Sequence, residues 1–320
     1  MSDTAALILL SRLEIQNANA VSGPLSWGFP APTAFSGFTH ALQRQLDGVE
    51  LGGVGIVCHW FDPQVYRPPG RYTQVFRLAR HPYIAGWKKF ADKPASFVEE
   101  GRSHMTVSLL LEVRTELDED DREELANELR SRIPAMRLAG GSVRGLKRQP
   151  EVLEWPEFVQ DQRRQFRKLR YRLLPGFTLV ERQDVLAEHL DALRARESSA
   201  GPLDALLDLL ALHADPELDE STGAVNWRVR SRPGWLVPVP AGYAALSELH
   251  EAGSVAGARD MDVPFQFVES LYTVGQWVAP HRLSAVEEMF WYPESDAKTG
   301  IYRSTNRFAA LQKELSHGKN

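Results

Sequence analysis

Cysteine is nearly absent from this sequence, and that absence excludes two kinds of site. The 320 residues contain one cysteine, so the chain can form neither an internal disulfide nor a zinc site built from several cysteines. This residue, Cys58, stands in an apolar strand pattern, which predicts a buried and unreactive thiol. The nine histidines include no HxH or HxxxH pair. We therefore expect no metal site.

Motifs of nucleotide-binding proteins and hydrolases are missing as well. The sequence has no phosphate-binding loop, no GxGxxG after a predicted strand and no GxSxG. The apolar run at residues 5–10 is too short for a signal peptide or a membrane span. We expect a cytoplasmic protein that makes no membrane contact and needs no cofactor.

Positive charge is in short supply overall but is locally concentrated. The net charge of −5 disfavours a protein that binds nucleic acid over its whole surface. In "YRPPGRYTQVFRLARHPYIAGWKK", residues 66–89, basic and aromatic residues alternate and no acid occurs. This composition suits backbone contacts and base stacking on single-stranded RNA. "RRQFRKLRYR", residues 163–172, has six basic residues on a predicted helix, a pattern that is also typical of a solvated face.

The first half of the chain predicts an α+β body. Residues 7–15 alternate between apolar and polar side chains, which predicts a strand with one buried face. The apolar positions of that face are Leu7, Leu9, Leu13 and Ile15. Asn17 and Asn19 continue this buried register past the apolar part, so we expect them at an edge of the sheet. The remaining predicted elements are strands 53–61, 103–113 and 136–143 and helices 33–46, with Thr33 as N-cap, and 117–133.

This order of strand, helix, strand, long insertion, strand, helix, strand is the split βαβ pattern of ferredoxin-like, RRM-like folds. We expect a body at residues 1–145 with an insertion at 62–102. An irregular α/β half at residues 146–320 packs on that body. It is expected to hold two helices in 184–213, an extended segment at 233–247 and a helix-like apolar core at 265–277.

Candidate binding residues lie where the predicted strands end. A loop with Ser22, Trp27 and three prolines separates the first strand from the first helix. Gly140 and Gly141 have two interpretations: a tight turn at a strand end, or a place where backbone amides approach a phosphate. The outer face of the predicted strand 103–113 carries polar residues instead of aromatic platforms, which argues against an ordinary RRM.

Two other functions remain open from the residues alone. His104, His81 and Tyr83 are side chains that can act as general acids and bases, as in a metal-independent ribonuclease. Alternatively, the chain is a protein-only scaffold, with the proline-rich segment 233–247 as its interface.

Several long motifs resemble one known family. The stretch "IQNANAVSGPLSWGFPAPTAFSGFTHAL" resembles the opening signature of the Cas-five-type subunit of the type I-F CRISPR surveillance complex, the Csy complex. Further similar segments are "MRLAGGS", "LLPGFTLV", "PGWLVPVPAGYAALS" and "FVESLYTVGQWVAPHR". They follow in the same order, from residue 15 to about residue 303. The insertion and residues 145–160 match less well.

The resemblance implies a non-catalytic RNA-binding subunit with a ferredoxin-like body and a thumb-like insertion. Such a subunit holds the 5′ handle of the CRISPR RNA in an antiviral ribonucleoprotein. It pairs with the large subunit that reads the PAM, so its contact with target DNA is indirect, and it abuts an adjacent backbone subunit. Guide processing belongs to a separate endonuclease, and no catalytic or metal-binding residue is implied.

On this basis we expect four groups of residues to bind RNA. The amide side chains of Gln16, Asn17 and Asn19 supply polar contacts. In the same group, the loop supplies a hydroxyl group through Ser22 and a ring for stacking through Trp27. The glycine turn admits phosphate at Gly140, Gly141 and Ser142, beside Arg137. The insertion contributes Arg71, Phe76, Arg77 and Arg80. The last group, which equally suits orienting the body or facing a partner, is Arg259, His281 and Arg282.

Overall fold

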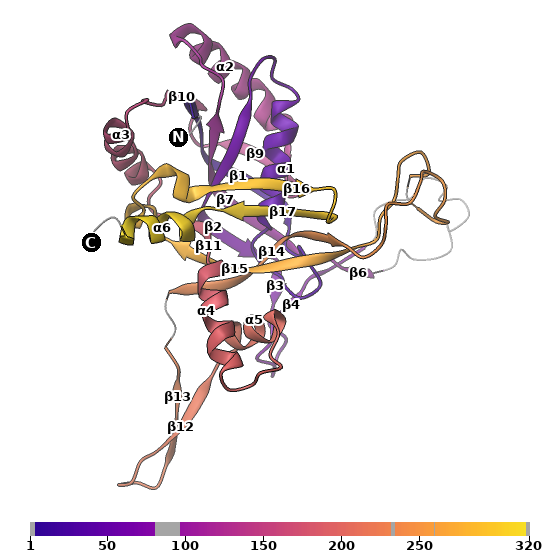
Figure 1. Ribbon diagram of the computed structural model, residues 1–320, viewed down its shortest axis with the longest axis vertical. Helices are drawn as coiled ribbons and strands as arrows, with labels where there is room; N and C mark the ends of the chain where they lie inside the picture. Colours follow the sequence, from indigo (N-terminus) through magenta and orange to yellow (C-terminus); the bar gives the residue numbers. More distant parts are fainter. Residues whose placement is uncertain (1–3, 81–96, 232–233, 259, 318–320) are drawn as a thin grey trace.

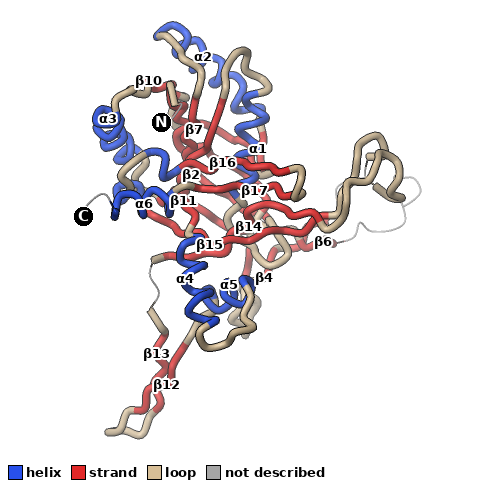
Figure 2. Tube along the Cα trace, in the orientation of Figure 1, coloured by secondary structure: helices blue, strands red, loops and turns tan. Residues whose placement is uncertain are grey.

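The computed structural model describes residues 4–80, 97–231, 234–258 and 260–317. It has a mixed α+β architecture around one large antiparallel sheet (Figures 1 and 2). At the centre of this sheet, four strands lie in the order β2, β7, β1, β9. Their bounds are Leu51–Pro63 for β2, Arg102–Val113 for β7, Ala6–Asn19 for β1 and Gly141–Leu146 for β9. All of their pairings are antiparallel.

Helices follow β1 and β7, in the predicted order. Helix α1 is Pro32–Gln43 and helix α2 is Glu119–Arg132, followed by the 3-10 helix η2 at Ile133–Ala135. The N-cap of α1 is Ala31 and its first residue is Pro32. Thr33 as N-cap was therefore wrong, because proline fits the first helical position, where no backbone N–H is needed.

Strand β1 is buried on both faces, so the prediction of one buried face was wrong. A β-bulge between Leu10 and Leu13, with Arg12 at φ 52°, changes which side its residues face. As a result, Leu7 and Leu9 pack in one core cluster while Leu13 and Ile15 pack in the other. A second register shift follows Ile15, so Ala18 is buried while Asn17 and Asn19 are exposed.

The two cores lie on opposite faces of the sheet. One is covered by α1 and α2 through residues such as Phe35 and Leu129. The other is covered by α3 (Val159–Arg172) and the 3-10 helix η4 (Val286–Met289), through residues such as Phe166 and Met289. Helix α6 (Phe308–His317) packs beside η4.

The second half of the chain extends the same sheet. Its strands are β10 (Glu151–Glu154), β11 (Phe177–Glu181), β14 (Trp235–Ala245), β15 (Val268–Val278), β16 (Phe290–Asp296) and β17 (Ile301–Asn306). Both β16 and β11 pair with β2, and β10 pairs with β1. The halves therefore share one sheet.

The helix expected at 265–277 was wrong, because that segment is strand β15. Short apolar runs do not distinguish a buried strand from a buried helix, and β15 is held by β14 along its whole length. The extended segment at 233–247 is strand β14. Its prolines Pro238 and Pro240 fit there because β14 pairs with β17 only from Gly242 onward.

The remaining elements project from this body. Helices α4 (Gln183–Arg194) and α5 (Pro202–Leu210) are the two expected in 184–213, and the hairpin of β12 (Ala214–Leu218) and β13 (Val225–Val229) extends away from the sheet (Figure 1). The insertion between β2 and β7 contains two small hairpins. They are formed by β3 (Val65–Tyr66) with β4 (Val75–Phe76), and by β5 (Leu78–Arg80) with β6 (Phe97–Glu99). None of the described helices is long and apolar enough to cross a membrane.

Candidate RNA-binding surface

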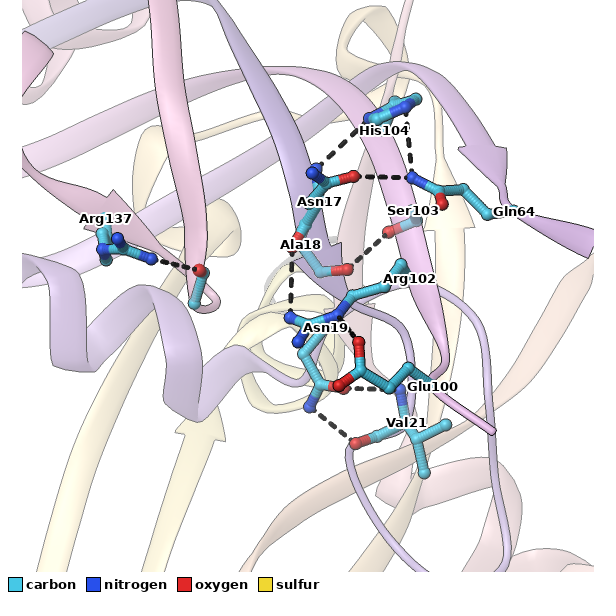
Figure 3. A network of polar contacts seen from close by, with 11 residues as sticks. Asn17, Ala18, Asn19, Val21, Gln64, Glu100, Arg102, Ser103, His104 and Arg137 are labelled. Atoms are coloured by element: carbon cyan, nitrogen blue, oxygen red, sulfur yellow. Dashed lines mark hydrogen bonds and ion pairs between the residues drawn. The ribbon is translucent and has the colours of Figure 1, made fainter. Parts of the chain in front are cut away.

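A polar network occupies the end of β1, beside β7 and the exit of β2 (Figure 3). Asn17 has a positive φ of 58°, and its backbone N–H donates to Nδ1 of His104 at 3.2 Å. Gln64 Nε2 donates to the Asn17 side-chain oxygen at 2.7 Å and lies 3.2 Å from His104 Nε2. The Asn17 amide nitrogen has no partner among the described residues, so it is available to an acceptor on a ligand.

A charged pair continues this network toward the insertion. Arg102 Nη1 donates to the Asn17 carbonyl oxygen at 3.4 Å, and Arg102 Nε lies 3.1 Å from Glu100 Oε2. The guanidinium therefore holds the end of β1 against the start of β7, and Glu100 offsets its charge.

Asn19 and Ser22 build the loop at residues 20–31. The Asn19 amide donates to the Val21 carbonyl at 2.7 Å and accepts from the Val21 N–H at 3.1 Å. Ser22 Oγ accepts from the backbone N–H of Ala31 at 3.1 Å, across the loop. Both side chains thus fix the backbone of the loop, in the way that short polar side chains commonly close turns.

The glycine pair forms a hairpin turn between β8 (Arg137–Leu138) and β9. Ala139 and Gly140, at φ 50° and 73°, are the two residues of its loop, as in a type I′ turn. A Cβ at Gly141 would lie 2.8 Å from the Ala18 nitrogen and the Gln16 oxygen, so Gly141 lets β9 approach β1 closely. A Cβ at Gly140 would meet nothing within 4 Å, so this residue borders open space.

Two cavities flank the loop, one on each side. The first, of about 480 Å³, is lined mainly by aromatic and proline side chains together with Ser22 and Ser26. Its aromatic residues are Trp27, Phe29, Trp60, Phe61, Phe177, Trp235 and Trp277. The second, of about 590 Å³, joins Asn19, Ser22 and Gly140 with Tyr243 and Tyr302. The loop is the wall between an aromatic cavity and a more polar one.

Exposed tryptophans border the aromatic cavity. Trp27 and Trp60 are each 52% exposed, and the Trp27 ring meets Phe76 of the insertion edge-on, with centroids 5.2 Å apart. Trp60 also lines a smaller hollow of about 340 Å³ that contains Gln16 and His104. Half-exposed rings of this kind can stack on bases without loss of the protein core.

The structure brings together most of the predicted residues on the β1 side. Gln16, Asn17, Asn19, Ser22, Trp27, Phe76 and Gly140 lie along these three hollows and their network. Arg137 donates to the Gly140 carbonyl at 3.3 Å and pairs across the hairpin with Ser142, which pairs in turn with Gln16.

Other predicted residues lie elsewhere. Arg71 and Arg77 are exposed in the insertion, and Arg80 belongs to β5. His281 and Arg282 belong to the 3-10 helix η3 (Pro280–Arg282), which packs against α3. Because α3 covers the opposite face of the sheet from α1, the structure separates these two residues from the loop. Arg259, His81 and Tyr83 lie outside the described residues.

Two titratable groups near the aromatic cavity have perturbed pKa values. Burial raises the pKa of the Cys58 thiol to about 12, so the thiol stays protonated, as expected for an unreactive cysteine. Burial also lowers the pKa of His59, whose ring nitrogens lie 2.6 Å from the Pro175 carbonyl oxygen and 2.7 Å from Ser108 Oγ. Its contacts make His59 part of the packing between strands.

Sequence reasoning missed Trp60, Gln64, Trp235 and Trp277 as parts of this surface. Trp60 lies near the end of β2, and Gln64 directly follows this strand. Plain alternation would place Trp60 on the face of the buried Val54 and Ile56, and a register shift between Cys58 and Trp60 exposes it instead. Trp235 and Trp277 are opposite one another on β14 and β15, a pairing that no local pattern reveals. Among the described residues, no three His, Cys, Asp or Glu side chains are grouped to hold a metal ion.

Comparison with known proteins assigns this chain to a family. A family model described as CRISPR-associated protein (Cas_Csy2) matches residues 8–304. The chain belongs to the Csy2 family. The CRISPR-associated protein Csy2 of Pseudomonas aeruginosa strain UCBPP-PA14 is 45% identical over 324 residues, which cover 96% of this chain and 98% of that protein. The chain is thus a Cas-five-type subunit of a type I-F CRISPR surveillance complex, as the motifs indicated.

Proposed function

We propose that this chain is the non-catalytic subunit that holds the 5′ handle of the CRISPR RNA, on the surface formed by the loop at residues 20–31 and its flanking hollows. The observation that carries the proposal is that residues of this loop line both an aromatic cavity and a second cavity that holds Asn19 and Ser22. Irregular single-stranded RNA is read where bases can leave the stack, insert between aromatic rings and pair their edges with amides.

Within this surface the residues have different tasks. Asn19 and Ser22 hold the loop, Trp27 and Trp60 offer faces for bases, and the free amide nitrogen of Asn17 offers a donor to a base edge. Gly140 leaves space for a phosphate beside Arg137. The cationic insertion adds a grip on the bound RNA through Arg71, Phe76, Arg77 and Arg80.

The proposal also assigns the architecture and the partners. The antiparallel order β9, β1, β7, β2, with α1 and α2 on one face, supports a ferredoxin-like body at residues 1–145 with a thumb-like insertion. Residues 146–320 form the second half, packed on this body. The chain works in a cytoplasmic ribonucleoprotein, in contact with the large PAM-reading subunit and an adjacent backbone subunit.

Crosslinking tests the assignment of the surface. The type I-F complex is assembled by co-expression with a guide whose handle contains 4-thiouridine, irradiated and digested. Crosslinked peptides are expected from residues 20–31 and from the end of β2 near Trp60. Crosslinks in this chain confined to α3 or to the β12–β13 hairpin would contradict the proposed surface. Cleavage of repeat RNA by the purified chain, abolished by His104→Ala, would show that the chain is a nuclease instead.

A further inference from the structure

Helix α3 carries a stripe of cations that the handle surface does not use. The stripe consists of Arg163, Arg164, Arg167 and Lys168, all of them exposed. Residues three or four positions apart share a face of a helix, so these four side chains lie on one side. The helix buries Phe166 and Leu169 on the other side, and the stripe therefore faces solvent.

The four cations have no ion-pair partner among the described residues, a property that they share with other exposed arginines such as Arg44 and Arg130. No carboxylate of the described residues lies within ion-pair distance of Arg163, Arg164, Arg167 or Lys168. By contrast, Arg172 at the end of the same helix pairs with Glu151, and Arg122 on α2 pairs with Glu154. Between residues 163 and 172 the sequence has no acid. In a chain with a net charge of −5, the four cations form a local positive patch that attracts polyanions. At one end of this patch, Arg163 borders a hollow that is also lined by Glu287 and Glu314.

The predicted residues His281 and Arg282 belong to the same side of the molecule. The 3-10 helix η3 packs on α3, and Arg170 Nη1 donates to the Leu283 carbonyl at 2.7 Å. His281 and Arg282 are both exposed. Figure 1 shows α3 at one side of the molecule and strand β6 of the insertion at the other. The α3–η3 surface is therefore remote from the insertion and on the opposite face of the sheet from α1.

We propose that the α3–η3 surface binds the phosphate backbone of double-stranded target DNA, as a second nucleic-acid site distinct from the handle surface. The inference rests on the proposed function, since a duplex target reaches this chain only within a surveillance complex. Four unpaired cations along one helix face match a row of phosphates, which needs charge without base contacts. The exposed rings of this helix, Phe158 and Tyr171, lie at its two ends and not among the four cations. The stripe itself therefore offers charge without a stacking face, which suits a duplex, whose bases already stack on one another.

The salt dependence of duplex binding tests this inference. The full complex with its guide is prepared with wild-type chain or with Arg163→Gln, Arg164→Gln, Arg167→Gln and Lys168→Gln combined. Binding of a fluorescent PAM-containing target duplex is then measured by anisotropy over a range of salt concentrations. Each phosphate contact contributes about 0.9 to the slope of log K against log salt. The slope is expected to fall by about 3 to 4 in the stripe variant.

A matched variant controls for the loss of charge alone. Arg44, Arg130, Arg196 and Lys298 are exposed, form no ion pair among the described residues and lie outside α3 and η3. Changing these four to Gln removes the same charge and is expected to leave the slope unchanged. Equal slopes for the stripe and control variants would refute the inference. Loss of guide RNA from the stripe variant, with an unchanged duplex slope, would reassign the stripe to the guide and also refute it.

The same preparation separates this inference from the proposed function. If the wild-type complex retains guide RNA that crosslinks to the loop while the stripe variant binds duplex with the wild-type slope, only the second site is wrong. If the wild-type chain assembles no guide-containing complex, the proposed function fails and the inference fails with it. Thermal unfolding of both variants near the wild-type temperature confirms that the surface changes leave the fold intact.

Discussion

The clearest test of the handle surface compares its two asparagines, because the structure gives them different tasks. Asn19 uses both polar atoms of its side-chain amide to bind Val21, whereas the amide nitrogen of Asn17 has no partner among the described residues. Asn19→Ala removes two hydrogen bonds of an exposed loop, which together stabilise it by about 1–2 kcal/mol. For a protein of 320 residues, the melting temperature should fall by roughly 1.5–3 °C.

Asn17 needs a different substitution. Its φ of 58° is tolerated by asparagine and glycine but costs alanine about 1 kcal/mol. Asn17→Gly therefore removes the amide without straining the backbone. If the amide donates one hydrogen bond to a base edge, its loss weakens binding by about 1–1.5 kcal/mol, which is roughly a tenfold change in Kd.

The assay measures the binding of two RNAs by the purified chain, one with the handle sequence and one with the same bases scrambled. Asn17→Gly should weaken binding of the handle RNA about tenfold and change binding of the scrambled RNA little. Asn19→Ala should weaken both alike, because a loosened loop serves neither. An equal loss on both RNAs for Asn17→Gly would show that Asn17 reads no base. Full stability and normal binding in Asn19→Ala would refute its role in holding the loop.

Three further changes have defined outcomes. Gly141→Ala should lower the free energy of unfolding by about 1–3 kcal/mol in urea titrations, because its Cβ would meet the β1 backbone at 2.8 Å. As a control, Gly145→Ala should change this free energy little, because its Cβ would have no neighbour within 4 Å. Trp60→Ala should weaken binding of both RNAs by about 1–3 kcal/mol, since stacking does not depend on the base sequence. Trp227→Ala, an equally large change far from the cavity, should leave binding unchanged. Unchanged binding in Trp60→Ala would exclude stacking on Trp60. Burial raises the pKa of Glu288 from 4.5 to about 7, so the folded state holds its proton more tightly than the unfolded state and stability falls as pH rises from 4.5 through 7. Glu288→Gln should therefore gain up to about 3 kcal/mol on the wild type between pH 5 and pH 8 in urea titrations, and a constant difference would contradict the raised pKa.

Local pattern predicted the elements of the first half well, because each has its own signal. Alternation marked the strands, and leucine spacing marked the helix at 117–133. The cap of α2, in which Asp118 and Asp121 exchange hydrogen bonds, was not part of the prediction. The faces of β1 could not be read in the same way. The bulge at Arg12 depends on a hydrogen bond to the neighbouring strand β7, where Ser108 Oγ accepts from the Arg12 N–H at 2.9 Å.

Strand β15 illustrates the limit of composition. Its apolar run fits a buried helix as well as a buried strand, and only pairing with β14 and β11 decides between them. The aromatic cavity has the same origin, since Trp60, Trp235 and Trp277 come from three strands that are far apart in the sequence. Motifs locate a site when its residues are neighbours in the chain, and this cavity is made by neighbours in the sheet.

The stretch that carries the family resemblance, "IQNANAVSGPLSWGFPAPTAF", therefore acts mainly by fixing the conformation of the loop backbone. Gly23 lies where a Cβ would be 2.3 Å from the Tyr272 hydroxyl, and that hydroxyl accepts from the Leu25 N–H at 2.9 Å. With Asn19 and Ser22, these contacts fix a loop whose two sides become the walls of two cavities. A recognition surface built this way needs no reactive side chain. Its specificity comes from the shape of the hollows and from a few polar atoms, such as the Asn17 amide nitrogen, that have no partner in the part of the chain that the structure describes.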